Sequence, residues 1–108
     1  MKWYDDLYIG DSIVNKANRI RWKIEHRRIT PAVYLITFPS NPDNLLDIIP
    51  ARDLLLKGYP RQNLRIIGMA GDYEEAILLV QQIVEETLQN TNTTDIHSYL
   101  KSKRGQEA

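Results

Sequence analysis

Two groups of polar residues follow the two most apolar segments of the chain, and their oxygen atoms could bind a cation or a sugar. These candidate ligand-binding residues are Ser40, Asn41 and Asp43 after segment 32–38, and Gly71 and Asp72 after segment 64–70. If both segments are parallel strands, Asp43 and Asp72 lie at the same sheet edge, where α/β proteins bind ligands. Two carboxylates with amide oxygens could hold a hard cation such as Mg²⁺ or contact sugar hydroxyls. The same residue types are favoured at helix starts, so helix capping is the competing interpretation.

The glycine-bracketed turn 68–71 is a second candidate, because a helix start can bind a phosphate. The turn lacks the longer glycine pattern and the Lys-Ser/Thr pair of a phosphate loop. Asp72, Glu74 and Glu75 would repel a phosphate and would complement the helix dipole themselves. The sequence therefore favours an N-capped helix here, with Asp72 as the cap and Glu75 as its capping-box partner.

A basic strip with a tryptophan is the third candidate, in the segment expected to form the first helix. At about 100° per residue, the basic side chains follow one flank of the apolar stripe and the tryptophan lies opposite that stripe. These interaction candidates are Lys16, Arg19, Trp22, Lys23 and Arg27. Such a surface could bind a protein, or could bind nucleic acid by stacking and charge. Two alternatives remain: residues 20–26 form a half-buried strand, or Trp22 packs beneath the C-terminal segment.

Three arginines in the middle of the chain raise anion recognition as a further possibility. Arg52, Arg61 and Arg65 could bind an anion bidentately or neutralise an acidic sheet edge. Arg61 follows Pro60 and is expected at the end of its strand opposite the Gly68 turn. Scattered surface charges are the alternative interpretation.

Catalytic chemistry has little support in the sequence. His26 and His97 do not have metal-ligand spacing, and the chain contains no cysteine. Neither a Ser-His-Asp order nor a nucleophile-elbow motif is found. We therefore predict no catalytic residue, no metal site and no cofactor.

Composition predicts one globular domain that spans residues 1–108. The chain is 43% hydrophobic and 26% charged, which is ordinary for a folded protein. Its longest apolar runs have five residues, far fewer than the ~20 that span a membrane. Asp5 and Asp6 stand where a signal peptide needs a basic start and an apolar stretch. We therefore expect a cytoplasmic protein without a membrane segment.

The net charge is zero, but the charges are unevenly distributed along the chain. Residues 1–31 contain seven Lys/Arg and four Asp/Glu, whereas residues 32–95 contain four Lys/Arg and nine Asp/Glu. The sequence therefore predicts a basic first helix on an acidic body.

Hydrophobic periodicity predicts the order helix, strand, helix, strand, helix, helix. The expected helices are 11–27, 42–57 with an interruption at Pro50, 72–89 and 95–103, and the expected strands are 32–38 and 64–70. Segment 3–9 stays open as an edge strand or a cover over the core, and the tail 104–108 is expected to fray. This order indicates an α/β (or α+β) fold with a small two- or three-stranded parallel or mixed sheet covered by helices. Unpaired edges of so small a sheet favour a homodimer.

Three segments carry a resemblance to other proteins: YIGDS (8–12), NPDNLLDIIP (41–50) and IGMAGDYEEA (67–76). They resemble segments of small single-domain bacterial proteins of about this length with no assigned role. The resemblance covers nearly the whole chain and implies a cytoplasmic, stand-alone domain. It implies no activity and no site residue.

The leading hypothesis is a non-catalytic interaction or adaptor module, homodimeric, that contacts an unidentified protein partner through the first helix. The alternative is a module that binds a small ligand, a nucleotide or an anion, at the C-terminal ends of the strands. The third is weak nucleic-acid binding through the basic first helix, which the neutral net charge disfavours.

Overall fold

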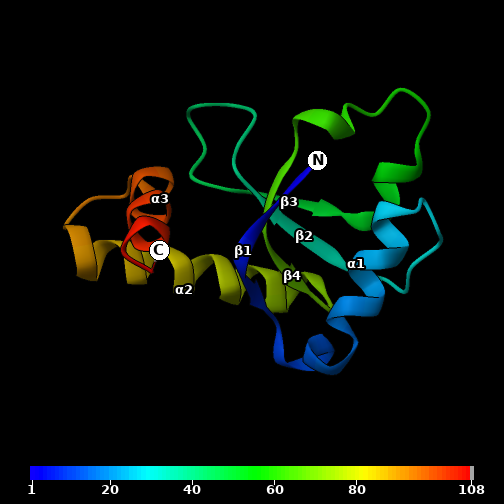
Figure 1. The fold of residues 1–108 in the computed structure, drawn as a ribbon, viewed down its shortest axis with the longest axis horizontal. Coiled ribbons are helices and arrows are strands. Elements are labelled where there is room, and N and C mark those ends of the chain that lie inside the picture. The colour runs from blue at the N-terminus through cyan, green and yellow to red at the C-terminus, as the bar shows by residue number, and fades with distance from the viewer. Residues whose placement is uncertain (108) are drawn as a thin grey trace.

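The computed structural model describes the backbone of residues 1–107 and the side chains of residues 1–103, and it contains a mixed four-stranded sheet with helices on both faces (Figure 1). The strands are β1 (Lys2–Ile9), β2 (Tyr34–Thr37), β3 (Asp47–Pro50) and β4 (Arg65–Ala70). The α-helices are α1 (Ala17–Glu25), α2 (Tyr73–Thr91) and α3 (Ile96–Glu107), and the 3₁₀ helices are η1 (Asp11–Lys16), η2 (Ala51–Leu55) and η3 (Arg61–Asn63). This arrangement confirms the predicted α/β class, with four strands instead of two or three.

The strand order is β1-β4-β2-β3, with β4 and β2 in the middle. β1 and β4 are parallel, whereas β2 is antiparallel to both β4 and β3. The predicted parallel pairing of segments 32–38 and 64–70 is therefore wrong, since Tyr34 pairs with Ala70 and Thr37 with Ile66. A parallel crossover usually needs a helix of several turns. Between β2 and β4 the chain forms only a strand and two short 3₁₀ helices.

The prediction of a helix over 42–57 is also wrong, because residues 47–50 form the strand β3. Asn41 caps a turn rather than a helix: its Oδ1 accepts a hydrogen bond from the Asp43 amide at 3.0 Å. Pro50 disfavours helical backbone at Ile49, the residue before it, and β-branched Ile48 and Ile49 suit a strand. Of the second predicted piece, residues 51–55 form the short 3₁₀ helix η2.

The remaining elements lie near their predicted places with shifted ends. Segment 3–9 belongs to β1, and the strand interpretation of 20–26 is wrong because α1 runs to Glu25. Helix α3 continues past the predicted end at Lys103 as far as Glu107. Of the tail that was expected to fray, Ala108 and the side chains of 104–107 lie outside the described residues.

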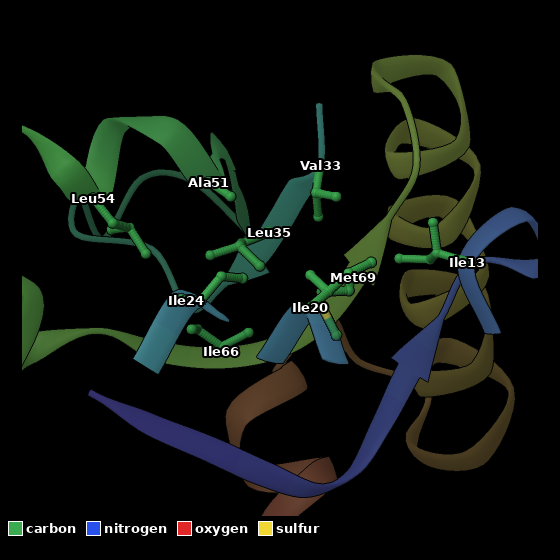
Figure 2. Close-up of a cluster of buried hydrophobic side chains, with 9 residues drawn as sticks. All are labelled: Ile13, Ile20, Ile24, Val33, Leu35, Ala51, Leu54, Ile66 and Met69. Carbon is green, nitrogen blue, oxygen red and sulfur yellow. The ribbon is translucent and has the colours of Figure 1, made fainter. Parts of the chain in front are cut away.

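The two faces of the sheet bury separate hydrophobic clusters. Figure 2 shows the first, beneath α1, η1 and η2, where Ile24, Leu35 and Ile66 gather. The second lies beneath α2 and α3, and includes Ile36 and Ile67. Consecutive residues of a strand point to opposite faces, so Leu35–Ile36 and Ile66–Ile67 each supply both clusters.

Helix α2 buries a different set of side chains against the sheet from the set that periodicity predicts. Leu79 and Thr87 are buried, although neither belongs to the apolar face that periodicity predicts for this helix. That predicted face consists of Ala76, Ile77, Val80, Ile83, Val84 and Leu88. Ile77 and Leu88, which belonged to the predicted apolar face, are 37% and 41% exposed. The buried stripe thus includes a threonine, whose hydroxyl donates to the Ile83 carbonyl at 2.8 Å.

Gly68 lets β1 lie close to the middle of β4. A Cβ atom at this position would lie 2.9 Å from the Tyr8 carbonyl oxygen and 3.3 Å from Cδ1 of Ile36. Contacts below 3.0 Å with backbone force the backbone to move. The sheet register is irregular on both sides of this position, between Trp3 and Tyr8 and between Ile36 and Thr37.

Candidate functional site

A pocket of about 310 Å³ lies where the first residues of β1 and β4 meet the start of α3. We call it the basic pocket; the side chains that matter are Lys2, Tyr4, Phe38, Arg65, His97 and Lys101. Lys2 and Tyr4 are two residues apart in β1 and point to the same sheet face. His97 and Lys101 are four residues apart in α3 and share one helix face. Segments from both ends of the chain therefore form this pocket together.

The basic pocket carries positive charge that no carboxylate of residues 1–103 neutralises through an ion pair. Lys2, Arg65 and Lys101 are exposed, and none of them forms an ion pair with a described residue. None of the described residues that line the pocket is acidic. A concave surface with one sign of charge concentrates ions of the opposite sign. The pocket is therefore suited to an anion.

His97 is held between an arginine and an aromatic ring. Nη1 of Arg65 donates to Nε2 of His97 at 3.3 Å, and arginine has no acceptor atom, so Nε2 must accept. The Phe38 ring meets the imidazole edge-on, with centroids 5.0 Å apart and an interplanar angle of 62°. These contacts fix the Arg65 side chain at the mouth of the basic pocket.

A carboxylate with three donors joins α3 to the rest of the fold. Oε2 of Glu86 accepts hydrogen bonds from Tyr8 Oη at 2.5 Å and Tyr99 Oη at 2.9 Å. Nζ of Lys103 lies 3.4 Å from the same oxygen. The cluster connects β1, α2 and α3, and thereby positions the helix that carries His97.

The pKa values of this cluster follow from its burial and hydrogen bonds. Burial, and then the bond to Glu86, raises the pKa of Tyr8 well above its ordinary value and that of Tyr99 to about 12. Burial alone would raise the pKa of Glu86, but the two phenols and the Lys103 ammonium lower it overall. Periodicity places Glu86 on the polar face of segment 72–89 and predicts that it faces water; this prediction is wrong, because Glu86 is half-buried.

A second cavity of about 800 Å³ adjoins the basic pocket, and we call it the Thr37 cavity. Its polar lining residues are Thr37, Ser40, Asp47, Tyr59 and Asn63. It shares Phe38, Arg65 and His97 with the basic pocket. The two cavities therefore have these three residues as a common wall.

The predicted ligand residues after β2 lie in the loop that precedes β3. Because β2 and β4 are antiparallel, this loop lies beside the start of β4, at the end of the sheet opposite Gly71 and Asp72. The structure therefore does not bring Asp43 and Asp72 together. Ser40 lines the Thr37 cavity, and its amide donates to Oδ2 of Asp47 at 3.1 Å.

At the start of α2, the predicted residues bind other parts of the chain. Oδ1 of Asp72 accepts from the Glu75 amide at 2.7 Å, as expected of an N-cap. Oε1 of Glu75 accepts from the Gly71 amide and from Ser12 Oγ, both at 2.7 Å. Hydrogen bonds from Gly71, and then from Ser12, lower the pKa of Glu75. These contacts favour the capping interpretation for Asp72. The prediction of Glu75 as its capping-box partner is wrong, because the Glu75 side chain binds Gly71 and Ser12 and not the Asp72 amide.

The predicted basic strip extends from the end of η1 along α1 to Arg27, and it is largely exposed. Trp22 is 51% exposed and stacks on His26, with ring centroids 4.1 Å apart. The alternative in which Trp22 packs beneath the C-terminal segment is therefore wrong. Of the four basic candidates, Lys16, Arg19 and Arg27 are exposed and Lys23 is half-buried.

The three central arginines have three different environments. Arg52 is exposed on η2. Arg61 is buried, and its Nη2 donates to the Ile24 carbonyl at 2.6 Å, so its interpretation as a surface charge is wrong. Arg65 lines both cavities, which fits the anion-recognition possibility raised for it.

The sequence did not single out Lys2, Thr37, His97 or Lys101 as parts of a site. Lys2 and Arg65 each begin an apolar strand, and this shared position was the available signal. Their proximity requires the parallel pairing of β1 with β4, in which Lys2 is opposite Arg65. The place of α3 depends on tertiary contacts that periodicity does not reveal.

Among residues 1–107, no helix combines the length and the apolar composition that crossing a membrane requires. The described residues include no group of three or more histidine, aspartate or glutamate side chains placed to hold a metal ion. We also compared the chain with known proteins. No family model, no curated protein and no solved structure matches it.

Proposed function

We propose that this protein binds a small phosphate-bearing molecule in the basic pocket. The observation that carries the proposal is that Lys2, Arg65 and Lys101 converge on one pocket without a carboxylate among its described lining residues. Three cations that have no ion pair within residues 1–103 repel one another, and an anion between them removes that repulsion. A phosphate carries enough charge and enough acceptor oxygens to contact all three.

The rest of the pocket supports a ligand with an organic part. Tyr4 and Phe38 are half-buried and line the pocket beside the cations. Small-molecule sites commonly combine apolar or aromatic walls with a few polar groups that fix orientation. The volume of about 310 Å³ lies at the low end of the range for such sites.

The sequence also led to an anion or a nucleotide as the ligand, but at a different end of the sheet. The sequence placed a nucleotide or anion beside Asp43 and Asp72, at strand C-terminal ends. The basic pocket instead lies at the N-terminal ends of the parallel strands β1 and β4. Arg65 is the residue that connects the two views, because the sequence already raised it as an anion ligand.

Isothermal titration calorimetry with inorganic phosphate, AMP and glucose 6-phosphate at low salt tests the proposal. The double variant Arg65→Gln/Lys101→Gln is expected to bind at least about tenfold more weakly, because hydrogen bonds to charged groups contribute about 1.5–3 kcal/mol each. The control is Arg52→Gln/Lys57→Gln, which removes the same charge from exposed residues outside the pocket. Equal weakening in both variants, or no binding by the wild type, would contradict the proposal.

A second candidate function is protein interaction through α1. It is favoured by the exposed Trp22–His26 stack beside the basic residues Lys16 and Arg19. Exposed tryptophan and arginine are common anchors of interfaces. In this view the protein is a homodimer or captures a partner through this surface, and a nucleic acid is the third candidate occupant.

Sedimentation analysis of wild type and Trp22→Ala tests the dimer, with Tyr73→Ala as a control at another exposed aromatic. We expect Trp22→Ala alone to shift the protein toward the monomer. Binding of a short single-stranded DNA that falls steeply with salt would favour the nucleic-acid candidate instead. Unchanged self-association in Trp22→Ala would contradict the assignment of this surface to a dimer.

A further inference from the structure

The Thr37 cavity has walls suited to a hydroxyl-bearing ring. Ile48, Pro60 and Leu64 supply apolar surface, and Phe38 and Tyr59 supply aromatic rings. Asp47 and Asn63 add polar atoms to the same cavity. Apolar walls with a few convergent polar groups are typical of small-molecule sites.

One residue that lines this cavity has a buried polar atom with no hydrogen bond to the described part of the chain. The Oγ1 atom of Thr37 is buried, in a residue only 1% exposed, and finds no partner among the described residues. A buried hydroxyl without a partner is costly, and nearly all such groups are paired. By contrast, the buried hydroxyl of Thr87 donates to the Ile83 carbonyl. Thr37, a strand residue that lines the cavity, therefore has a hydroxyl with unused donor and acceptor capacity.

Two further groups in the cavity can exchange hydrogen bonds with a ligand. Asp47 accepts from the Ser40 amide at 3.1 Å and from its hydroxyl at 3.4 Å, both at Oδ2. Its Oδ1 has a single long contact, 3.5 Å from Nδ2 of Asn44, so it retains acceptor capacity. Burial, followed by the charges of Asp53 and Asp47, raises the pKa of Tyr59, so this phenol stays protonated and able to donate.

The Thr37 cavity and the basic pocket share a wall. Phe38, Arg65 and His97 line both. A ligand whose phosphate reaches Arg65 from the basic pocket thus has its remaining atoms beside a cavity with unpaired hydrogen-bonding groups.

We infer that the ligand is a phosphorylated sugar whose ring occupies the Thr37 cavity, with a sugar hydroxyl hydrogen-bonded to Thr37 and its phosphate bound by Arg65 in the basic pocket. This inference rests on the proposed function and specifies the substrate class of the same site. A free sugar phosphate and a nucleotide share the required chemistry, a phosphate ester of a polyhydroxylated ring. The choice between them depends on what else the cavity accepts.

Calorimetry with inorganic phosphate, glucose, glucose 6-phosphate and AMP tests the inference. Wild type is expected to bind at least one of the two esters more tightly than inorganic phosphate. Tighter binding of glucose 6-phosphate than of phosphate supports a free sugar phosphate. Tighter binding of AMP alone supports a nucleotide. Esters that bind no more tightly than phosphate would overturn the inference and leave the basic pocket intact as an anion site. Absence of all binding would overturn both.

Thr37→Val removes the hydroxyl at nearly constant volume and isolates its contribution. We expect binding of the favoured ester to weaken about fivefold, as for loss of one neutral hydrogen bond, with phosphate binding unchanged. Thr37→Ser is expected to restore binding. Thr87→Val is the matched control, because it removes a buried hydroxyl that already has a partner. Equal weakening of ester and phosphate by Thr37→Val, or unchanged ester binding, would overturn the role of Thr37.

Thermal unfolding of the same variants separates binding from folding. Thr37→Val removes an unpaired buried polar group, so its melting temperature is expected to equal or exceed that of wild type. A lower melting temperature together with weaker ester binding would assign the effect to the fold and overturn the inference.

Discussion

Nη1 of Arg65 and Nε2 of His97 lie 3.3 Å apart, and this contact joins the first residue of β4 to the first turn of α3. The two residues are also shared by both cavities. The site therefore depends on the docking of α3, which Glu86 also secures through Tyr99 and Lys103.

Replacement of Glu86 is expected to weaken this docking. Glu86→Ala leaves the phenols of Tyr8 and Tyr99 without their acceptor, and the free energy of unfolding should fall by about 2–3 kcal/mol. Urea unfolding followed by circular dichroism measures the change. Glu85→Ala is the control: Glu85 is adjacent to Glu86 but exposed, so its replacement should lower the free energy of unfolding by less than about 0.5 kcal/mol. Equal losses in the two variants would contradict the role of the cluster.

Stability should decline in acid because Glu75 and Glu86 have lowered pKa values in the folded protein. A carboxyl group with a lowered folded-state pKa stabilises the fold fully above its unfolded-state value. That stability is lost as the pH falls below the ordinary value of 4.5 and through the folded-state pKa. Urea midpoints measured from pH 7 to pH 3 should therefore fall mainly in the lower half of this range, and less so in Glu86→Gln. A flat profile would contradict the lowered values.

Stability should also decline in alkali, with the opposite sign of shift. The folded-state pKa of Tyr99 is raised to about 12, and that of Tyr8 is raised as well, from an ordinary 10.0. A phenol with a raised folded-state pKa stabilises the fold fully below pH 10. That stability is lost as the pH rises through the folded-state pKa. Urea midpoints of wild type should fall above pH 10, whereas Tyr8→Phe/Tyr99→Phe should fall less steeply. Parallel curves for the two proteins would show that the phenols titrate normally.

Much of the fold followed from local sequence signals, and the errors have physical causes. Asp72 and Glu75 gave the start of α2 because capping needs only neighbouring residues. Asn41-Pro42 is also typical of a helix start, but here Asn41 closes a turn. Ile48 and Ile49 then pair with β2 instead of continuing a helix. Strand pairing of this kind outweighs helix signals that no tertiary contact supports.

The candidate site was less predictable than the fold. Arg65 was recognised as a possible anion ligand from its type alone. Its neighbours Lys2 and Lys101 come from opposite ends of the chain, and only the sheet order brings them together. The predicted parallel pairing of β2 with β4 also placed Asp43 at the wrong end of the sheet.

Glu75 should contribute more to stability than the adjacent Glu74. Glu75→Ala removes the acceptor of the Gly71 amide and the Ser12 hydroxyl, and we expect a loss of about 1–2 kcal/mol. Glu74→Ala, at an exposed position in the same helical turn, is expected to cost less than about 0.5 kcal/mol. Chemical denaturation of the two variants makes the comparison. If Glu74→Ala lowers the free energy of unfolding as much as Glu75→Ala or more, the proposed stabilising link between η1 and α2 is wrong.

Gly68→Ala should loosen β1, because the added Cβ would lie 2.9 Å from the Tyr8 carbonyl oxygen. We expect a loss of about 1–3 kcal/mol, as for an overpacked core, and faster hydrogen exchange of β1 amides. Gly58→Ala is the contrast: it has open space but a φ of +84°. Its loss of about 1 kcal/mol should come from backbone strain and leave β1 exchange unchanged. Equal protection of β1 in both variants would contradict the close approach at Gly68.

The strand order has a consequence for how the chain folds as it is synthesised. β2 and β3 are sheet neighbours that follow one another in sequence, so their hairpin can form as soon as both have left the ribosome. β1 is made first, yet its partner β4 is made last of the four strands. The N-terminal strand therefore stays unpaired until the middle of the sheet arrives, and a chain halted before Arg65 has no β1 partner. Since Lys101 follows later still, the basic pocket is complete only after α3 has been made and has docked.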